Sequence, residues 1–255
     1  MCLILLSWRQ RADFPLVLAA NRDEFHARPT AAAAFWPEAP QLLAGRDLLG
    51  GGTWLGITRA GRWAAVTNIR DPSIPRPGCA SRGVLVRDFL LGDQSPGDYL
   101  REVAGHAENY AGFNLLAGDR EQLGYFGSRE EAPKLLPPGL YGLSNGRLGD
   151  RWPKTVGGSA ALGALLAVPA PPDPQALFAI LADRSRPPDE QLPATGVGLE
   201  WERLLASRFI VSIAYGTRSS TVLRFDGQGG MEFFERSFSP AGTVCAEVRQ
   251  TLEPG

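Results

Sequence analysis

The sequence contains little of what disulfide scaffolds and metal centres are built from. Its 255 residues include two histidines and three cysteines, Cys2, Cys79 and Cys245, which lie far apart in the chain. An odd number of distant cysteines argues against a disulfide framework, and their spacing matches no zinc pattern. We therefore expect a cytoplasmic protein that binds no metal and needs no cofactor.

Long apolar runs and an excess of charge are also missing. The apolar run Leu3 to Leu6 is followed by Arg9 and Arg11, so it has neither the length nor the preceding basic segment of a signal peptide. No stretch approaches the ~20 apolar residues that a membrane-spanning helix needs. The formal net charge is -1, which gives no basic surface for nucleic acid. The partner that remains is a small-molecule substrate or a hydrophobic ligand.

The residues that are present form an ordered series of strand and helix patterns. Short apolar runs predict strands at 2–8, 15–20, 52–58, 62–68, 113–117, 122–127, 140–144, 209–214, 220–225 and 232–238. Apolar spacing and capping residues predict helices that follow Ser81 as an N-cap, run from Pro96 toward 107, and cover 155–167 and 174–182. Loops rich in proline are expected at 28–40, 71–77 and 184–196.

The order of these elements predicts the fold class. Strands come in runs, and the helices arrive in pairs between them. This order favours antiparallel sheets covered by helices over a parallel doubly wound sheet. We expect an α+β protein, a four-layer α/β/β/α sandwich of two mainly antiparallel sheets, with residues 1–255 forming a single domain.

The second residue has two interpretations. Cys2 could be a small apolar side chain that opens a buried strand, because free cysteine is among the most buried residue types. Alternatively, Met1 is removed because the next side chain is small, and Cys2 then carries both a thiol and a free α-amine. An α-amine with a pKa of ~7.7 to 8.0 can take the thiol proton directly or through a water. In this second interpretation Cys2 is a nucleophile that supplies its own base.

A cluster of charged residues follows the second predicted strand, in the segment AANRDEFHARPT at 19–30. Such clusters are usually solvated turns. If the first two strands pair as a hairpin, however, the end of the second returns toward the start of the first and brings Asn21, Arg22 and Asp23 near Cys2. A carboxylate there would orient the α-amine, and an arginine would lower the thiol pKa or hold an anionic substrate.

Two asparagines close further apolar strands, Asn68 after AAVT and Asn145 after YGLS. A side-chain amide donor beside a backbone N–H is what the oxyanion of an acyl-transfer reaction needs. Each residue is equally consistent with a turn asparagine that tolerates left-handed dihedral angles. Both are therefore candidates for the oxyanion site, and neither is settled by its position.

Eight segments, in order and across nearly the whole chain, resemble one family. They are MCLILL, AANRDEFHARPT, GGGTWLGIT, VTNIRDP, SRGVLV, YAGFNLLAGD, YGLSN followed by RWPK, and YGTRSSTVLRF. Together they resemble the NRDE protein family, which is named after the tetrapeptide Asn21 to Glu24 and is also the transport and Golgi organisation protein 2 family.

The resemblance implies an N-terminal nucleophile (Ntn) hydrolase-like α/β/β/α fold. The wider superfamily includes penicillin V acylases, bile salt hydrolases and acid ceramidase-like amidases, which begin Met-Cys and hydrolyse amides through the processed cysteine. Their G-R-N-x-D motif is similar to AANRD here, with Asn21 and Asp23 at its Asn and Asp. The catalytic arginine of that motif falls on Ala20, and Arg22 is displaced from it by two residues, a shift of about 6 to 7 Å along a strand.

The resemblance also implies roles for residues elsewhere. VTNIRDP and LSNGR resemble the segments that carry the oxyanion asparagines of the acylases, which points again to Asn68 and Asn145. ASRF resembles a late S-R-F segment of those enzymes, and YGTRSST belongs to the NRDE pattern itself. The expected catalytic residues are Cys2, Asp23, Asn68 and Asn145, and the expected substrate-binding residues are Asn21, Arg22, Arg208 and Arg218.

Two functions are consistent with these expectations. The first is a C–N amide hydrolase or acyl-transfer enzyme in which mature Cys2 attacks the carbonyl carbon of a small substrate. The second is a non-catalytic carrier that uses the same fold to hold haem or a lipid, which the displaced arginine and the themes reported for the family favour. In the second case His26 is the candidate axial ligand for haem.

Overall fold

The computed structural model describes residues 2–72 and 78–253. Its strands form two antiparallel sheets. The first sheet has the order β10-β1-β2-β11-β12-β13, with β10 (Gly139–Leu143), β1 (Cys2–Trp8), β2 (Leu16–Phe25), β11 (Tyr215–Phe225), β12 (Met231–Phe238) and β13 (Val244–Leu252). The second has the order β3-β4-β5-β6-β7-β8-β9, with β3 (Thr30–Trp36), β4 (Ala39–Asp47), β5 (Leu55–Thr58), β6 (Trp63–Asn68), β7 (Phe113–Gly118), β8 (Leu123–Gly127) and β9 (Lys134–Leu135).

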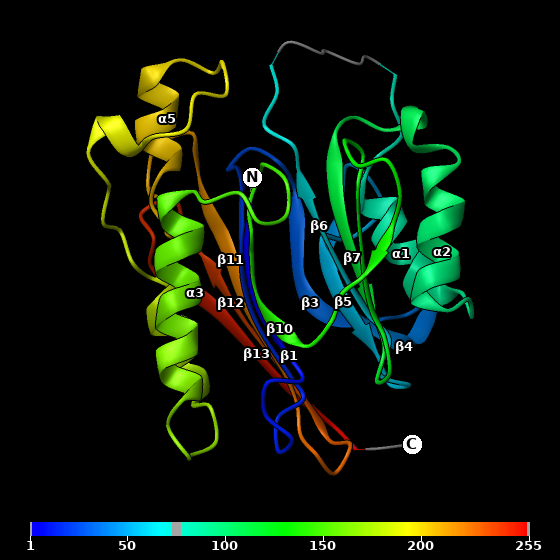
Figure 1. Cartoon of the computed structure of the whole chain (residues 1–255). Helices are drawn as coiled ribbons and strands as arrows, with labels where there is room; N and C mark the ends of the chain where they lie inside the picture. Colours follow the sequence, from blue (N-terminus) through cyan, green and yellow to red (C-terminus); the bar gives the residue numbers. More distant parts are fainter. Residues whose placement is uncertain (1, 73–77, 254–255) are drawn as a thin grey trace.

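Two helices cover the outer face of each sheet (Figure 1). The first sheet packs against α3 (Pro153–Leu166) and α4 (Pro174–Leu181), and the second against α1 (Gly83–Leu91) and α2 (Pro96–Ala104). A fifth helix, α5 (Leu199–Leu205), and two short 3₁₀ turns complete the chain. The predicted α/β/β/α order is therefore confirmed. Among the described residues, no helix is long and apolar enough to cross a membrane.

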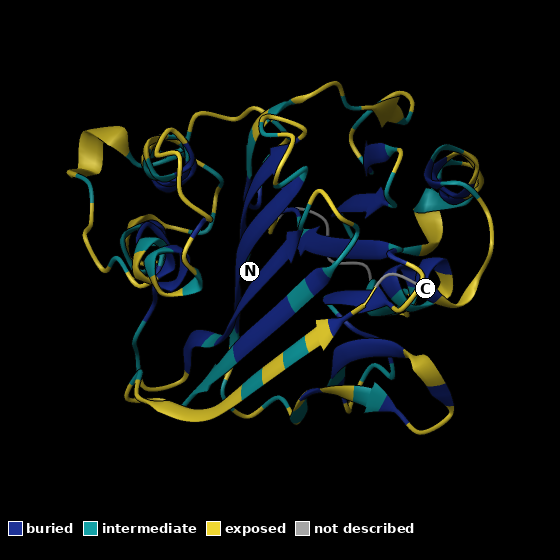
Figure 2. Ribbon diagram, turned by 90° about the horizontal axis from the view of Figure 1, so that it is seen from below, coloured by how far each residue is buried: buried dark blue, intermediate teal, exposed yellow. Residues whose placement is uncertain are grey.

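Three apolar layers hold the sandwich together, and strand alternation decides which residues enter each layer. Ile4 and Leu6 of β1 pack between the two sheets, whereas Leu3 and Leu5 of the same strand pack against α3 and α4. The third layer lies between the second sheet and its helices, around Phe89. Figure 2 shows the buried strands between helices whose outward faces are exposed. Because the first sheet is covered on both faces, a polar side chain at the end of β1 or β2 enters one of two buried environments.

Most of the predicted elements are confirmed to within a few residues, including the hairpin of β1 and β2 and the start of α2 after Ser95, whose side chain accepts a hydrogen bond from Asp98 N at 3.1 Å. The loop predicted at 28–40 is wrong, because β3 and the start of β4 occupy it. Ala33 N donates to Glu235 Oε1 at 2.7 Å, and the pairing of β3 with β4 is interrupted by two register shifts. Tertiary contacts, not the weak β propensity of alanine, hold this strand.

The strand predicted at 209–214 is also wrong. The backbone groups there bond to scattered partners and form no ladder with a neighbouring strand: Phe209 N donates to Asp183 O at 2.9 Å, and Ile210 N donates to Thr217 Oγ1 at 2.9 Å. Ser81 is not the N-cap of α1. The N-cap is Arg82, whose side chain makes no capping hydrogen bond. The sequence interpretation did not include α5 or β13. Residues 73–77 of the predicted loop at 71–77, and Met1, lie outside the described residues.

Candidate functional site

The hairpin of β1 and β2 places Cys2 at one end of the sandwich. Its register sets Cys2 opposite Arg22, so the expected approach of the segment 21–23 to Cys2 is confirmed. Cys2 lies two residues before Ile4 in β1, so its side chain points to the same face of the strand as that of Ile4, which packs between the sheets. Opposite residues of an antiparallel pair point to the same face, and neighbours along a strand point to opposite faces. Cys2 and Arg22 therefore point between the sheets, whereas Asn21 and Asp23 point toward the helices.

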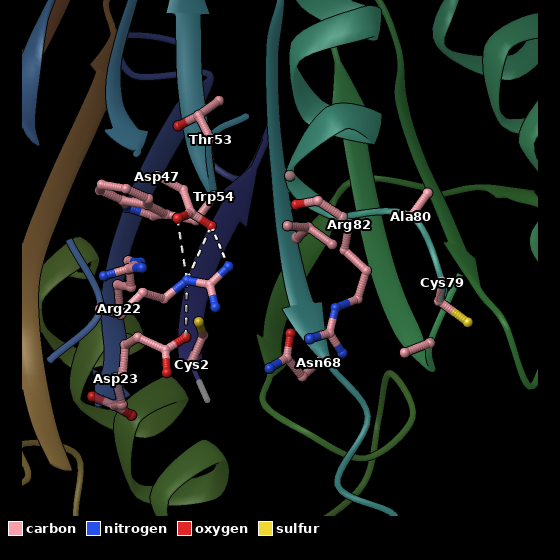
Figure 3. A pocket seen from close by; sticks show the side chains of 16 residues that line it. Cys2, Arg22, Asp23, Asp47, Thr53, Trp54, Asn68, Cys79, Ala80 and Arg82 are labelled. Carbon is pink, nitrogen blue, oxygen red and sulfur yellow. Dashed lines mark hydrogen bonds and ion pairs between the residues drawn. The ribbon is translucent and has the colours of Figure 1, made fainter. Parts of the chain in front are cut away.

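A cavity of ≈ 320 Å³ lies beside Cys2 (Figure 3). Its walls come from β1 and β2 of the first sheet, from β4 and β6 of the second, and from the start of α1. The charged and polar residues of the lining include Cys2, Arg22, Asp23, Glu24, Arg28, Asp47, Asn68 and Arg82. Asp23 is among them although its carboxylate bonds to Thr217 on the helix-facing side. The fold thus brings four of the predicted site residues, Cys2, Arg22, Asp23 and Asn68, to one cavity.

The arginines of the cavity are held in different ways. Arg28 pairs with Asp47 at 2.7 Å. Arg22 is 6% exposed and lies over the Trp54 ring, with its guanidinium carbon 4.3 Å from the ring centre. Arg22 Nη1 has no hydrogen-bond partner among the described residues. Arg82 donates from Nη1 to a backbone carbonyl at 3.2 Å, and the remainder of its guanidinium group extends into the cavity (Figure 3).

Opposing influences act on the Cys2 thiol. Burial raises the pKa of Cys2, and the nearby carboxylate of Asp23 acts in the same direction. The guanidinium group of Arg22 opposes them, and the backbone N–H of Asp23 also stabilises the thiolate. The net result is a thiol with a pKa above its ordinary value, so an additional base is needed to deprotonate it at neutral pH.

The two predicted oxyanion asparagines occupy different positions. Asn68 lines the cavity at the end of β6. Asn145 is 1% exposed and does not line it; its Nδ2 donates to Asn68 O at 2.9 Å. Ser144 Oγ lies 2.9 Å from Cys2 O, to which it donates, and 3.2 Å from Asn145 Oδ1. The end of β10 therefore ties the start of β1 to the end of β6 and positions Asn68 relative to Cys2.

The helix-facing side of the same strand ends is fully buried. Asp23 Oδ1 accepts a hydrogen bond from Thr217 Oγ1 at 2.7 Å. Lys154, in the first turn of α3, is 5% exposed, and burial lowers its pKa to about 8 against the opposing effect of Asp23. Arg70 forms a buried ion pair with Glu202 of α5. Burial raises the pKa of Asp23, and the charge of Lys154 lowers it.

Asn21 and Arg208 lie outside the cavity and connect the first sheet to α4. Asn21 Nδ2 donates to Leu181 O at 3.0 Å and to Arg208 O at 2.7 Å, and Arg208 Nη1 donates to Ile180 O at 2.9 Å. Arg208 also pairs with Asp183. These contacts give both residues a place in the packing of α4.

Arg218 and His26 are also outside the cavity beside Cys2. Arg218 Nη1 donates to backbone carbonyls at the end of β2 and just after it, the nearest being Phe25 O at 3.0 Å. Its side chain lines a separate cavity of ≈ 240 Å³ with Glu235 and Trp54. His26 Nε2 lies 3.1 Å from Ser212 O. Among the described residues, no group of three or more His, Cys, Asp or Glu is placed to hold a metal ion.

Sequence reasoning missed two charged residues near Cys2. Arg82 lies in the segment SRGVLV, and Lys154 in RWPK. Both segments contribute to the family resemblance, but neither residue forms a local pattern with Cys2. The packing of the two sheets and the docking of α3 bring them to the site. Membership of a matching segment was the one available signal.

The comparison with protein families is consistent with this architecture. The model of a family described as Transport and Golgi organisation 2 matches residues 1–240. The chain is 37% identical over 259 residues to the Transport and Golgi organization protein 2 homolog of Bos taurus, and 36% identical over 258 residues to that of Homo sapiens. Each match covers 93% of this chain and 93% of the relative.

Solved structures share the fold at low sequence identity. A mutant conjugated bile acid hydrolase from Clostridium perfringens aligns with a TM-score of 0.54 at 9% identity, over 99% of this chain and 97% of that one. An N-acylethanolamine-hydrolyzing acid amidase ortholog from Caenorhabditis elegans aligns with a TM-score of 0.50 at 10% identity, over 87% of this chain and 92% of that one. These similarities identify an Ntn-hydrolase-like fold.

Proposed function

The chain belongs to the Transport and Golgi organisation 2 family, and from this premise we propose that it hydrolyses an amide or related acyl substrate with mature Cys2 as the nucleophile. One observation carries the proposal. Cys2 opens β1 at the wall of a cavity that also holds Arg22, Asn68 and Arg82, in a fold that the two hydrolases share. A cysteine that were merely packing in a core would not need a polar cavity beside it.

The proposed reaction has two halves. Removal of Met1 leaves an α-amine on Cys2, and this amine accepts the thiol proton. The sulfur attacks the carbonyl carbon, the C–N bond breaks, and the departing nitrogen takes the proton from the α-amine. Water then attacks the resulting thioester, which releases the acid and restores the thiol.

The neighbouring side chains would assist different steps. Asn68, which lines the cavity, would donate to the oxyanion, and Asn145 would keep the Asn68 backbone in position. Asp23, one residue beyond the partner of Cys2 in the register, would orient the α-amine. Arg22 and the Asp23 backbone N–H favour the thiolate.

Intact-mass spectrometry of protein from its native host tests the first requirement, a mature chain without Met1. Retention of Met1 would rule out this mechanism. Labelling with a thiol-reactive acyl probe tests the second, in protein whose other cavity cysteine, Cys79, is replaced by serine. There Cys2→Ala should abolish labelling of the cavity, whereas the matched variant of the exposed Cys245, Cys245→Ala, should leave it unchanged. Circular dichroism spectra of both variants should match that of the wild type.

A carrier for haem or a lipid is the second candidate function. It is favoured by Ala20, which stands where the acylases carry their catalytic arginine. Titration with haem, followed by absorbance in oxidised and reduced protein, tests it. A Soret shift that persists in Cys2→Ala would support a carrier, and a flat titration would count against haem as the ligand.

A further inference from the structure

Two of the three arginines that line the cavity have no carboxylate to neutralise them. Arg28 is paired with Asp47, and Glu24 lies 4.0 Å from the same guanidinium group. Across residues 2–72 and 78–253, Arg22 and Arg82 form no ion pair. Glu24 and Asp47 act on Arg22 through space, and Glu24 also acts on Arg82. Neither of these two guanidinium groups, however, has a carboxylate in direct contact among the described residues.

The two unpaired guanidinium groups flank the reacting sulfur. Arg22 lies opposite Cys2 in the strand register. Arg82 reaches the same cavity from the start of α1, on the other wall (Figure 3). Burial lowers the pKa of both arginines, and negative charge on Cys2 opposes this effect in each case. Both cations are therefore close enough to Cys2 to respond to its charge.

A desolvated guanidinium group without an anion is unfavourable, and a bound anion would remove that cost. Arginine matches carboxylate and phosphate oxygens well because its N–H groups form a planar fork. Arg22 carries such a fork, and its buried Nη1 has no hydrogen-bond partner among the described residues. The cavity of ≈ 320 Å³ has room for a small charged substrate.

We infer that this cavity binds substrates that carry an anionic oxygen group, a carboxylate or a phosphate, between Arg22 and Arg82 and next to the carbonyl that Cys2 attacks. The inference rests on the proposed function for the reaction itself. Binding of the anion does not require turnover, so the two can be tested separately.

The test compares two alkylating reagents of similar size, anionic iodoacetate and neutral iodoacetamide, by the rate at which each labels Cys2. Cys79, which also lines the cavity, is replaced by serine in every protein, and labelled sites are identified by peptide mass. The ratio of the two rates cancels the fraction of thiolate, so it reports charge selectivity and not the thiol pKa. We expect the ratio at Cys2 to fall about tenfold in Arg82→Gln, as the loss of one close charge predicts, and to recover in part in Arg82→Lys.

The matched control is Arg101→Gln, an equal change of charge at an exposed arginine of α2, which should leave the ratio unchanged. In the wild type, methyl phosphate and acetate are each added as competitors of iodoacetate labelling. The anion that protects Cys2 at the lower concentration distinguishes a phosphate site from a carboxylate site. This arm needs no variant, so it decides the question even if Arg82→Gln does not fold.

An equal ratio in wild type and folded Arg82→Gln would overturn the inference, as would the failure of both anions to protect Cys2. Retention of Met1, together with a ratio of labelling rates that falls in Arg82→Gln as expected, would refute the proposed reaction and leave the anion site in place. The reverse result, a mature chain labelled by the acyl probe without charge selectivity, would refute the anion site alone.

Discussion

The two faces of the first sheet hold charge in opposite ways at the end where Cys2 lies. On the helix-facing side, Arg70 is paired with Glu202 and Asp23 accepts a hydrogen bond from Thr217, all in side chains that are nearly unexposed. On the cavity side, Arg22 and Arg82 meet no carboxylate among the described residues. On the helix-facing side Arg70 and Glu202 neutralise each other in direct contact, whereas on the cavity side the proposed anionic ligand would supply the missing contact.

Because side chains alternate between the two faces along a strand, this contrast arises between neighbouring residues. Arg22 and Asp23 are consecutive residues of β2, yet they point to different faces of the sheet. A residue on the closed face is expected to contribute to stability, and a residue on the open face to binding. Four experiments test this division, from the largest expected change in the free energy of unfolding to the smallest.

Breaking the buried ion pair should have the largest effect. Glu202→Ala leaves Arg70 charged and without its partner in the interior, so the free energy of unfolding should fall by about 3–5 kcal/mol. Urea unfolding followed by circular dichroism measures it. Glu200→Ala, in the same helix, removes an exposed partner of Arg203 and should cost less than about 1 kcal/mol. Equal costs for the two variants would contradict the closed face as a source of stability.

The pH dependence of stability should come next. Glu235 is 2% exposed, and burial raises its pKa to about 7. Between its unfolded pKa and pH 7 the folded state holds a proton that the unfolded state has lost, so stability falls as pH rises through this window, by on the order of 3 kcal/mol. Glu235→Gln should remove this slope in urea titrations at pH 5 to 8. Parallel curves for wild type and variant would show that the carboxyl is ionised in the fold.

The two asparagines should separate positioning from catalysis. Asn145→Ala removes the donor to Asn68 O and should lower the free energy of unfolding by about 1–2 kcal/mol. Asn68→Ala, at the cavity wall, should change stability by less than about 0.5 kcal/mol while slowing acylation of Cys2. Thermal unfolding and labelling by the acyl probe measure the two effects. Similar stability losses in both variants would mean that Asn68 is chiefly structural.

Arg82→Gln should have the smallest effect on stability. It loses one hydrogen bond to the Gly112 carbonyl but also removes the cost of a partly desolvated charge, so the net change should be under about 1 kcal/mol. Arg70→Gln is the matched change on the closed face and should cost several times more. A large loss in the free energy of unfolding of Arg82→Gln would show that this arginine has a structural role. The two faces of the sheet would then differ less in what they contribute to stability.

Local patterns were sufficient to predict the elements whose residues carry their own signals. The apolar runs of β1 and β2 and the Ser95-Pro96 start of α2 need no distant partner to be recognised. β3 could not be predicted in this way, because Ala31 to Ala34 have weak strand propensity and depend on contacts with β4 and β12. β13 was missed because most of its residues are exposed, and pairing with β12 holds it.

The same distinction between local patterns and distant contacts applies to the residues of the candidate site. Proximity of Cys2 to Arg22 and Asp23 follows from a hairpin, which sequence can predict. Arg82 reaches Cys2 because the second sheet and α1 pack across the sandwich, and no spacing in the chain encodes that contact. The burial of Asn145 likewise depends on where β10 pairs with β1. Residues at the ends of one hairpin are therefore within reach of sequence reasoning, and residues from opposite sheets are not.

The position of Cys2 in the first strand also decides how the protein can be handled. β1 begins at the cavity, whereas the register of β13 with β12, β11 and β2 places Leu252 at the other end of the sheet, in line with Trp8. A fusion partner or affinity tag joined ahead of Cys2 would start at the cavity and, under the proposed reaction, would block the α-amine. The same tag placed after Leu252 would leave the cavity open, which makes the carboxyl end the position of choice for purification or labelling.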